Sequence, residues 1–411
     1  MDKKNKNPNV PNLRFLKFTD EWSKFAVSEL LNTYSTNSLS WDKLSYVEKS
    51  KIKNIHYGLI HNGFKSTIIN GNNQFIPFIN NSFIPKSYTL LQNGDLILAD
   101  ASEDRKDVGR PVEMINVDNQ KIISGLHTIH ARNKTNLIID GFKGFYFQSC
   151  AMKKQIYKVA NGSKIYGISP SSFNELFISI PSKEEQQKIV NLLQKIECRI
   201  EIQIKIINDY YSLKKAIIQH IFNASAQYSK VHLDIILKEI SKKNKEQIHN
   251  NVLSVSNSLG FVKQSEQFVD REIASSDTSN YKIVNKNEYA YNPARINVGS
   301  IARLTNYDCG IVSPMYTVFE INTTRIIYEY FDYFLHSFTF QKQLNQRLEG
   351  SVRQCLTFNS MKNIEIELPP IEVQIEISKN MKHLDSKIKI ESDYLNLLKS
   401  QKNYLLKNMF T

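Results

Sequence analysis

The chain has 411 residues, 41% hydrophobic and 23% charged, a composition that fits a folded protein of two or more domains and excludes a disordered chain. No apolar run approaches the roughly 18 residues of a membrane-spanning helix, and four widely separated cysteines favour reduced thiols in a cytoplasmic protein over a disulfide framework. The net charge of +13 favours a polyanionic partner, although a merely basic soluble protein would carry the same charge.

The N-terminal half is predicted to be a β-rich region followed by a long helix. Residues 1–12 are rich in Lys, Asn and Pro and are predicted to form a flexible, solvated tail rather than a signal peptide. In residues 13–181, short apolar segments such as Gly94–Leu98 are interrupted by Gly, Asn and Pro, and the strand-like segment Leu176–Pro181 ends the region. A helix over 182–222 follows.

The C-terminal half is predicted to repeat this order. Residues 223–369 form a second β-rich region that ends in the strand-like segment Ile364–Pro369, and a second helix covers 370–411. The first helix starts with a capping-box pattern, Ser182 to Glu185, in which the hydroxyl accepts from the third amide and the glutamate reaches back. The second helix starts without this box, at a proline, which suits a first turn.

The two halves are copies of one another. Phe173–Phe222 aligns with Met361–Phe410 without a gap, and the match extends upstream to Gln155 and Gln343. We call the constant displacement that places Phe173 on Met361 the repeat offset. A looser similarity, displaced by one position more, relates Ser124, Thr128 and Ile129 to Ser313, Thr317 and Val318. Two copies of this length are domain-sized halves and not the units of a solenoid.

Both helices carry the heptad pattern of a coiled-coil seam. The seam residues are Ile189, Leu193, Ile196, Ile200, Gln203, Ile207, Tyr210, Lys214, Ile217 and Ile221 in the first helix, and Ile377, Met381, Leu384, Ile388, Glu391, Leu395, Leu398, Lys402, Leu405 and Met409 in the second. Polar residues interrupt the seam at matching places, Gln203/Glu391 and Lys214/Lys402. Either they fix the register and orientation of the helix pair, or they are solvated ends of the seam.

A second apolar stripe lies off this seam. Its members are Ile202, Ile206 and Ile218 in the first helix and Ile390, Tyr394 and Leu406 in the second. A two-stranded coil needs only one stripe, so these residues are predicted to bind a partner once per half. The alternative is that each stripe packs on its own β-rich region.

Three segments resemble a known family. Ile178–Ile189 reads ISIPSKEEQQKI, and this resembles the I-x-I-P-x-x-x-E-Q-x-x-I segment of the specificity (S) subunits of type I restriction–modification systems. Ile366–Ile377 resembles it too, although Val373 breaks the Glu-Gln pair, and Pro11–Trp22 is similar to the usual start of these subunits. The resemblance covers essentially the whole chain, including the duplication.

The resemblance implies an α+β fold with internal pseudo-two-fold symmetry. Two β-rich target recognition domains, 13–181 and 223–369, would be separated by two long spacer helices, 182–222 and 370–411, that form an antiparallel coiled coil. Each domain would read one half of a bipartite target in double-stranded DNA. Two modification (methyltransferase) subunits would dock on the helices, and restriction (translocase–nuclease) subunits would attach through them.

The resemblance also implies that the chain has no catalytic residues. Adenine methylation and restriction would belong to the partner subunits, which use S-adenosylmethionine, ATP and Mg²⁺, so no cofactor or metal is expected here. The sequence agrees: it has no Gly-rich phosphate loop, no Asn/Asp-Pro-Pro-aromatic motif and no His/Cys metal pattern. His127 and His130 are predicted to be structural or DNA-contacting, and the carboxylates of residues 100–107 to lie in a solvated loop.

DNA contacts are expected from loops of the β-rich regions, where basic and amide side chains bind base edges or phosphates. The candidates are Tyr57, His61, Asn62, Lys65, Arg105, Lys106, Arg110, Arg132, Lys134 and Lys164 in the first half, and Lys263, Gln264, Arg271, Arg295, Asn297, Arg303, Tyr316 and Arg353 in the second. The repeated Gly162-Ser163 and Gly350-Ser351 suit a phosphate-binding turn. For any single candidate the alternative is ordinary solvated surface.

Two other classes of function stay open. One is a monomeric DNA-modifying enzyme with an unrecognised site, and methyl transfer or cleavage by the purified chain alone would favour it. The other is a coiled-coil interaction scaffold. A complex with partners that shows no sequence-selective DNA binding would favour it.

Overall fold

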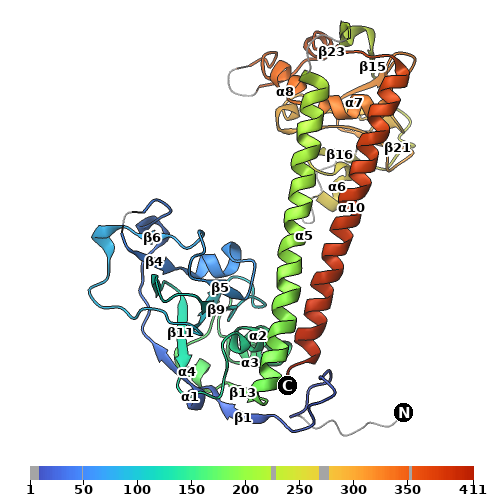
Figure 1. The fold of residues 1–411 in the computed structure, drawn as a ribbon. Coiled ribbons are helices and arrows are strands. Elements are labelled where there is room, and N and C mark those ends of the chain that lie inside the picture. Colours follow the sequence, from blue (N-terminus) through green and yellow to red (C-terminus); the bar gives the residue numbers. More distant parts are fainter. Residues whose placement is uncertain (1–8, 49, 224–227, 268–276, 351–353) are drawn as a thin grey trace, which may run out of the picture. The chain divides into compact units, whose positions relative to one another are not determined.

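The computed structural model describes residues 9–48, 50–223, 228–267, 277–350 and 354–411. The chain divides into two compact units, Met1–Lys205 with Ser392–Thr411 and Ile206–Glu391. Each unit contains one β-rich region and parts of two long helices, α5 (Lys183–Asn223) and α10 (Ile371–Asn408) (Figure 1). The predicted α+β organisation is confirmed, and so are both helices, whose first residues differ from the prediction by one position.

The first unit is built around a five-stranded sheet of order β2-β11-β7-β9-β5. A four-stranded sheet, β10-β4-β6-β3, and two pairs, β1-β13 and β12-β8, complete its strands. The strands are β1 (Ser23–Ala26), β2 (Leu31–Tyr34), β3 (Leu44–Ser45), β4 (Ile52–Ile55), β5 (Ile68–Asn70), β6 (Phe78–Ile79), β7 (Leu96–Ala99), β8 (Ala101–Ser102), β9 (Pro111–Ile115), β10 (Lys121–Ser124), β11 (Thr128–Asn133), β12 (Tyr166–Gly167) and β13 (Phe177–Ile180). The helices besides α5 are α1 (Val27–Leu30), α2 (Phe142–Gln148), α3 (Cys150–Val159) and α4 (Pro170–Asn174).

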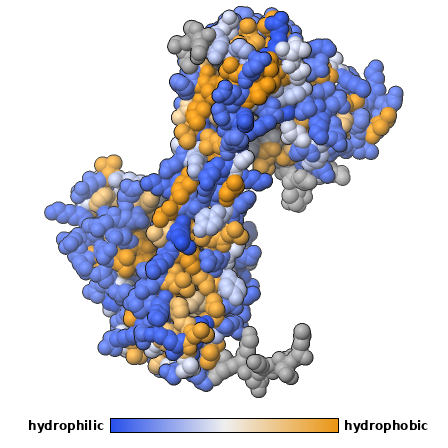
Figure 2. Space-filling model, turned by 45° about the vertical axis from the view of Figure 1, so that its right-hand side comes forward, coloured by the Kyte–Doolittle hydropathy of each residue, from blue (hydrophilic) through white to orange (hydrophobic). Residues whose placement is uncertain are grey.

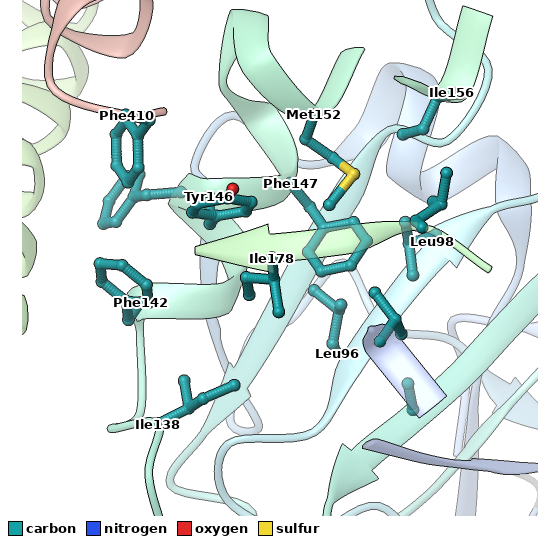
Figure 3. Close-up of a cluster of buried hydrophobic side chains, with 14 of the residues drawn as sticks. Leu96, Leu98, Ile138, Phe142, Tyr146, Phe147, Met152, Ile156, Ile178 and Phe410 are labelled. Carbon is teal, nitrogen blue, oxygen red and sulfur yellow. The ribbon is translucent and has the colours of Figure 1, made fainter. Parts of the chain in front are cut away.

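The main core of this unit lies between the five-stranded sheet and the helices. Figure 3 shows Leu96 and Leu98 of β7 in one cluster with aromatic residues of α2 and apolar residues of α3. The chain's last residues belong to the same core: the ring of Phe410 lies 5.7 Å from that of Tyr146 and 6.3 Å from that of Trp22, measured between centroids. On the opposite face of the sheet, Ile97 and Val112 belong to a second hydrophobic core.

The second unit repeats this plan, with fewer strands among its described residues. Its sheets are β15-β22-β19-β20 and the pairs β14-β23, β16-β17 and β18-β21. The strands are β14 (Lys230–His232), β15 (Leu237–Ile240), β16 (Leu253–Ser256), β17 (Gly260–Lys263), β18 (Lys282–Asn285), β19 (Tyr289–Tyr291), β20 (Ile301–Arg303), β21 (Cys309–Val312), β22 (Thr317–Ile321) and β23 (Glu365–Glu367). The helices besides α10 are α6 (Gln264–Gln267), α7 (Tyr328–Leu335), α8 (Phe338–Asn345) and α9 (Phe358–Lys362).

The repeat offset relates the two units, including their sheets. His130 pairs with Tyr34 of β2, and Val318, its counterpart at the repeat offset, pairs with Ile240 of β15. The looser sequence match around Ser124 is therefore wrong by one position. A displacement of one position exchanges the faces of a strand: Ile129 belongs to the core beside α2, whereas Val318 lies on the other side of its sheet.

The seam between the helices is confirmed, and its lysines are paired. Lys402 Nζ lies 2.6 Å from Glu197 Oε1 in the first unit, and Lys214 Nζ lies 2.5 Å from Asp385 Oδ1 in the second. The two ion pairs are related by the repeat offset. Because the start of α5 meets the end of α10, and the end of α5 meets its start, the helices run antiparallel. The solvated-end interpretation is wrong for both lysines; Gln203 is buried.

The glutamine of the repeated motif connects each helix start to its β-rich region. Gln186 Nε2 donates to the carbonyls of Leu137 and Pro181, and its Oε1 accepts from the amide of Ile139. Gln374 makes the same three bonds, to Arg325, Pro369 and Ile327. The motif therefore encodes a structural link that satisfies buried backbone groups.

The predicted capping box at the start of α5 needs correction. The capping box is half formed, because Glu185 binds Arg14 through two 2.7 Å bonds instead of reaching back to Ser182.

Most of the predicted N-terminal tail lies outside the described residues, but Asn9–Asn12 are ordered against the first unit and do not form a tail. The Asn9 carbonyl accepts from the Trp22 amide at 3.0 Å, and Pro11 is buried.

Candidate nucleic-acid interface

A pocket of about 630 Å³ opens in the first unit, and we call it the first pocket. Its walls are aromatic: the Tyr57 ring lies 4.6 Å from His56, 5.3 Å from His127 and 6.0 Å from His61, between centroids. Trp41, Asn62, Glu103 and Asp107 stand at its margin. Flat apolar surfaces beside amide and carboxylate groups suit a ligand with an aromatic ring and polar edges, such as a nucleobase.

The imidazoles of the first pocket are held in place. His61 Nε2 lies 2.9 Å from the Ala101 carbonyl, and the Gly58 amide donates to His56 Nδ1 at 3.1 Å. Burial, and then the nearby His127, lower the pKa of His56, so this ring is neutral at pH 7. His127 takes a positive φ of 54° and contacts Asp100 at 3.3 Å. A non-glycine residue in this strained conformation is a feature found often at functional sites.

A smaller pocket of about 320 Å³ opens in the second unit, and we call it the second pocket. Its floor is fixed by two hydrogen bonds, from the Val255 amide to the Tyr316 hydroxyl at 3.3 Å and from Ser300 Oγ to the Val255 carbonyl at 2.9 Å. Asn257, Gln264, Arg295, Val298 and Met315 also line the pocket. Its accessible chemistry is therefore that of a guanidinium, amides and an apolar rim.

In the first unit, the predicted DNA-contacting residues separate into four groups. Tyr57, His61 and Asn62 line the first pocket, and Lys65, Lys106 and Lys134 are exposed. Arg105 and Arg110 donate to backbone carbonyls, of Tyr157 and His61 respectively, each at 2.7 Å. Arg132 binds the buried Asp95 at 2.7 and 2.8 Å, and His130 completes this structural network, so the DNA contact of Arg132 stays a prediction.

In the second unit, Gln264 and Arg295 line the second pocket, and Lys263 and Asn297 are exposed. Tyr316 is buried and forms the pocket wall rather than an exposed contact. The Arg303 guanidinium binds Asp332 at 2.7 and 3.0 Å, and its DNA contact stays a prediction. Arg271 and Arg353 lie outside the described residues.

The repeated glycine turns have a structural cause. Gly162 has φ 134° and Gly350 has φ 102°, and each lies in a loop closed by an equivalent bridge, Asn161 with Gly167 and Glu349 with Cys355. A Cβ at Gly162 would lie 1.8 Å from the Ile165 carbonyl oxygen, so only glycine fits. Lys164 is exposed beside it, and its phosphate role stays a prediction.

The off-seam stripe is shorter than predicted. Ile218 and Leu406 are buried in the cores of their own units, so their assignment to a partner surface is wrong. Ile206 is half-buried, while Ile202, Ile390 and Tyr394 are 54%, 61% and 43% exposed. On the face that Figure 2 shows, hydrophobic residues are interspersed among hydrophilic ones.

Sequence reasoning missed several pocket residues, among them Trp41, His56, Asn257 and Met315. No local motif marks them, because each pocket is assembled from segments far apart in the chain. Among the described residues, no group of three or more His, Cys, Asp or Glu is placed to hold a metal ion. Within the same part of the chain, no helix combines the length and the apolar character needed to cross a membrane.

Two solved protein structures are similar to this chain over nearly its whole length. The chain matches a solved type I restriction-modification S subunit from M. genitalium with 17% identity and a TM-score of 0.52, over 98% of this chain and 99% of that one. A second match, at 14% identity and a TM-score of 0.58, covers 94% of this chain and 96% of a chain from a structure titled for complex assembly and conformational transition of the type I R-M system. At these identities, both matches show the fold.

The family is shown by the sequence match. Residues 19–209 and 220–400 each match the family described as "Type I restriction modification DNA specificity domain". The two matched segments together span most of the chain and coincide with the two halves of the duplication. The chain therefore belongs to the type I restriction–modification DNA specificity family, whose members set the DNA sequence specificity of these complexes.

Proposed function

We propose that this chain reads a bipartite target in double-stranded DNA, one half-site per unit, and directs adenine methylation and restriction by partner subunits. The carrying observation is that one duplicated scaffold presents two pockets with different linings. A duplicated scaffold suits two half-sites, and different linings suit two different base sequences. The chain itself supplies no catalytic group in this proposal, and S-adenosylmethionine, ATP and Mg²⁺ belong to the partners.

The test is methylome sequencing of cells that carry this chain together with its modification subunit. We expect one bipartite motif, with adenine methylated on opposite strands in the two half-sites. The purified chain alone should transfer no methyl group and cut no DNA. Methylation or cleavage by the chain alone would support the enzyme alternative, and assembled complexes without sequence preference would support the scaffold alternative.

We further propose that two modification subunits bind the exposed part of the off-seam stripe. Ile202 and Ile390 are related by the repeat offset and are both exposed, so each half offers an equivalent contact. Exchanging both for Asp should abolish partner binding, because burying an unpaired carboxylate is costly. The matched control is Asn208→Asp with Asn396→Asp, two exposed helix positions related by the same offset. A folded Ile202→Asp/Ile390→Asp variant that still binds two partners would contradict the assignment.

The helices are proposed to set the spacer between the half-sites. α5 has 41 residues, about 60 Å at roughly 1.5 Å per residue. Inserting one heptad at matching layers of both helices keeps the seam in register and adds roughly 10 Å, or about three base pairs at about 3.4 Å each. The methylated motif should then keep both half-sites and lengthen its spacer. An unchanged spacer in an active variant would exclude the helices as the measuring element.

A further inference from the structure

The two pockets lie at matching places in their units. In the first unit, Ile123 of β10 pairs in parallel with Asn54 of β4. In the second unit Ile311, the counterpart of Ile123 at the repeat offset, bridges in parallel to Val252. The chain that continues from these points, residues 56–62 and 253–257, lines the first and the second pocket respectively.

The other walls match as well. The loop after β7 supplies Ala101–Asp107 to the first pocket, and the loop after β19 supplies Asn292–Ser300 to the second. The turn before β11 supplies His127, and the turn before β22 supplies Met315, which corresponds to His127 at the repeat offset. Three topologically equivalent segments therefore contribute to each pocket, although the side chains at their matching places differ.

The second pocket presents polar groups that have no hydrogen-bond partner among the described residues. Arg295 and Asn257 are exposed, and neither side chain makes a hydrogen bond or ion pair to a residue in the described part of the chain. Gln264 Oε1 is buried at the pocket without a hydrogen-bond partner among these residues. A buried polar atom left unpaired is costly, so this arrangement indicates a ligand that offers both acceptors and donors. Guanine offers O6 and N7 to an arginine fork in the major groove.

The first pocket presents the opposite chemistry. Its exposed polar groups include the carboxylates of Glu103 and Asp107, which are acceptors only and make no hydrogen bond within the described chain. A carboxylate repels phosphate but accepts from an exocyclic amino group, such as cytosine N4. The aromatic walls around Tyr57 provide the apolar surface against which a base edge can pack.

We propose that these two equivalent pockets are the base-reading sites of the chain and that they select different bases. The second pocket selects a guanine through Arg295, supported by the amides of Asn257 and Gln264. The first pocket selects a base with an exocyclic amino group through Glu103 and Asp107. This inference rests on the proposed function: the common scaffold fixes where a base is read, and the pocket lining fixes which one.

The first test is Arg295→Ala in the full chain, expressed with its modification subunit and read by methylome sequencing. We expect one guanine position of one half-site to lose roughly 5- to 150-fold of its preference, the range of one good bidentate contact. The other half-site and the spacer should not change. The matched control is Arg325→Ala, an exposed arginine of the same unit outside the pocket. An unchanged motif in an active Arg295→Ala variant would overturn the assignment.

The second test is Glu103→Gln with Asp107→Asn, which keeps shape but removes both negative charges. We expect relaxed preference at a cytosine or adenine position of the other half-site only, with Glu175→Gln as the exposed control of the first unit. Changes in the same half-site as Arg295→Ala would overturn the proposal, as would no change. If wild-type complexes gave no bipartite motif at all, the proposed function would fail instead. Fluorescence anisotropy with the wild-type target distinguishes lost specificity from lost folding, because a folded variant keeps its salt-dependent nonspecific binding.

Discussion

Each unit contains an ion pair between an equivalent strand and an equivalent helix, but the acidic and basic residues have exchanged places. In the first unit the acid is on the strand: Glu113 of β9 lies 3.1 Å from Lys143 Nζ of α2 and accepts from the amides of Gly141 and Gly144. In the second unit the base is on the strand: Arg303 of β20 binds Asp332 of α7 at 2.7 Å.

Strand pairing makes these positions equivalent. Glu113 lies opposite Leu96, and Arg303 lies opposite Tyr289. Those two residues in turn pair with Ala131 and Phe319, which are related by the repeat offset. The scaffold therefore keeps a link between strand and helix, while the residues that make it have diverged completely. The glutamine link of Gln186 and Gln374, in contrast, is identical in both units.

The burial of the two ion pairs differs, and the largest predicted effect follows from this. Both side chains of Glu113–Lys143 are 0% exposed, whereas Arg303 and Asp332 are 13% and 30% exposed. Lys143→Met should destabilise the first unit by about 3–5 kcal/mol, because it leaves a buried carboxylate alone. Arg303→Met should cost the second unit less, about 1–2 kcal/mol, because water reaches Asp332.

Hydrogen exchange followed by mass spectrometry, as a function of urea, reports the free energy of opening in each unit separately. The control is Lys143→Met with Glu113→Gln, which removes both charges and should recover much of the loss. Equal losses in Lys143→Met and Arg303→Met would show that burial does not separate the two ion pairs.

The glutamine links should behave alike in both units. Gln186→Met and Gln374→Met each leave three backbone groups without a partner. We expect each to destabilise its own unit by about 2–4 kcal/mol. Gln187→Met, at an exposed neighbouring position, is the control. A loss confined to one unit would break the equivalence that the repeat offset describes.

The two lysines that pair across the helices, Lys402 and Lys214, should differ in how much stability is lost when each is replaced. Glu197 is 6% exposed beside Lys402, whereas Asp385 is 41% exposed beside Lys214. Lys402→Met is expected to cost about 2–3 kcal/mol, because it removes a charged hydrogen bond from a buried carboxylate, and Lys214→Met about 0–1 kcal/mol. Thermal unfolding of the two variants in parallel measures the difference. The reverse order would contradict the burial argument.

A further prediction is a pH dependence of stability in Lys143→Met. Burial raises the pKa of Glu113 above its usual range, and the nearby Lys143 charge opposes this rise. Because the folded state then holds a proton more tightly than the unfolded state, stability falls as pH rises from the unfolded to the folded pKa. Without the lysine, lowering the pH from 8 to 5 should restore part of the lost stability, because the Glu113 carboxyl is protonated more readily in the folded state than in the unfolded state. Stability of the variant that does not change over this range would contradict a buried, ionised Glu113.

The sequence by itself determined the duplication, the helices and the family. These follow from local rules: a heptad repeat is visible wherever apolar residues recur every three or four positions, and an ungapped match such as Phe173–Phe222 with Met361–Phe410 needs no structure to detect. Even the paired interruption at Lys214 and Lys402 was visible, although its partners Asp385 and Glu197 were not.

The tertiary structure alone decided which arginines are already paired with a carboxylate. Arg132 and Arg303 look like Arg295 in sequence, but folding places a carboxylate beside the first two. Ile218 and Ile202 are both off the seam of one helix, yet only Ile218 meets the core of its own unit. The pockets combine segments that are distant in the chain, such as those of His61 and Ala101. A periodic pattern is a property of neighbouring residues, whereas a pocket and its unpaired charges depend on which distant segments fold against each other.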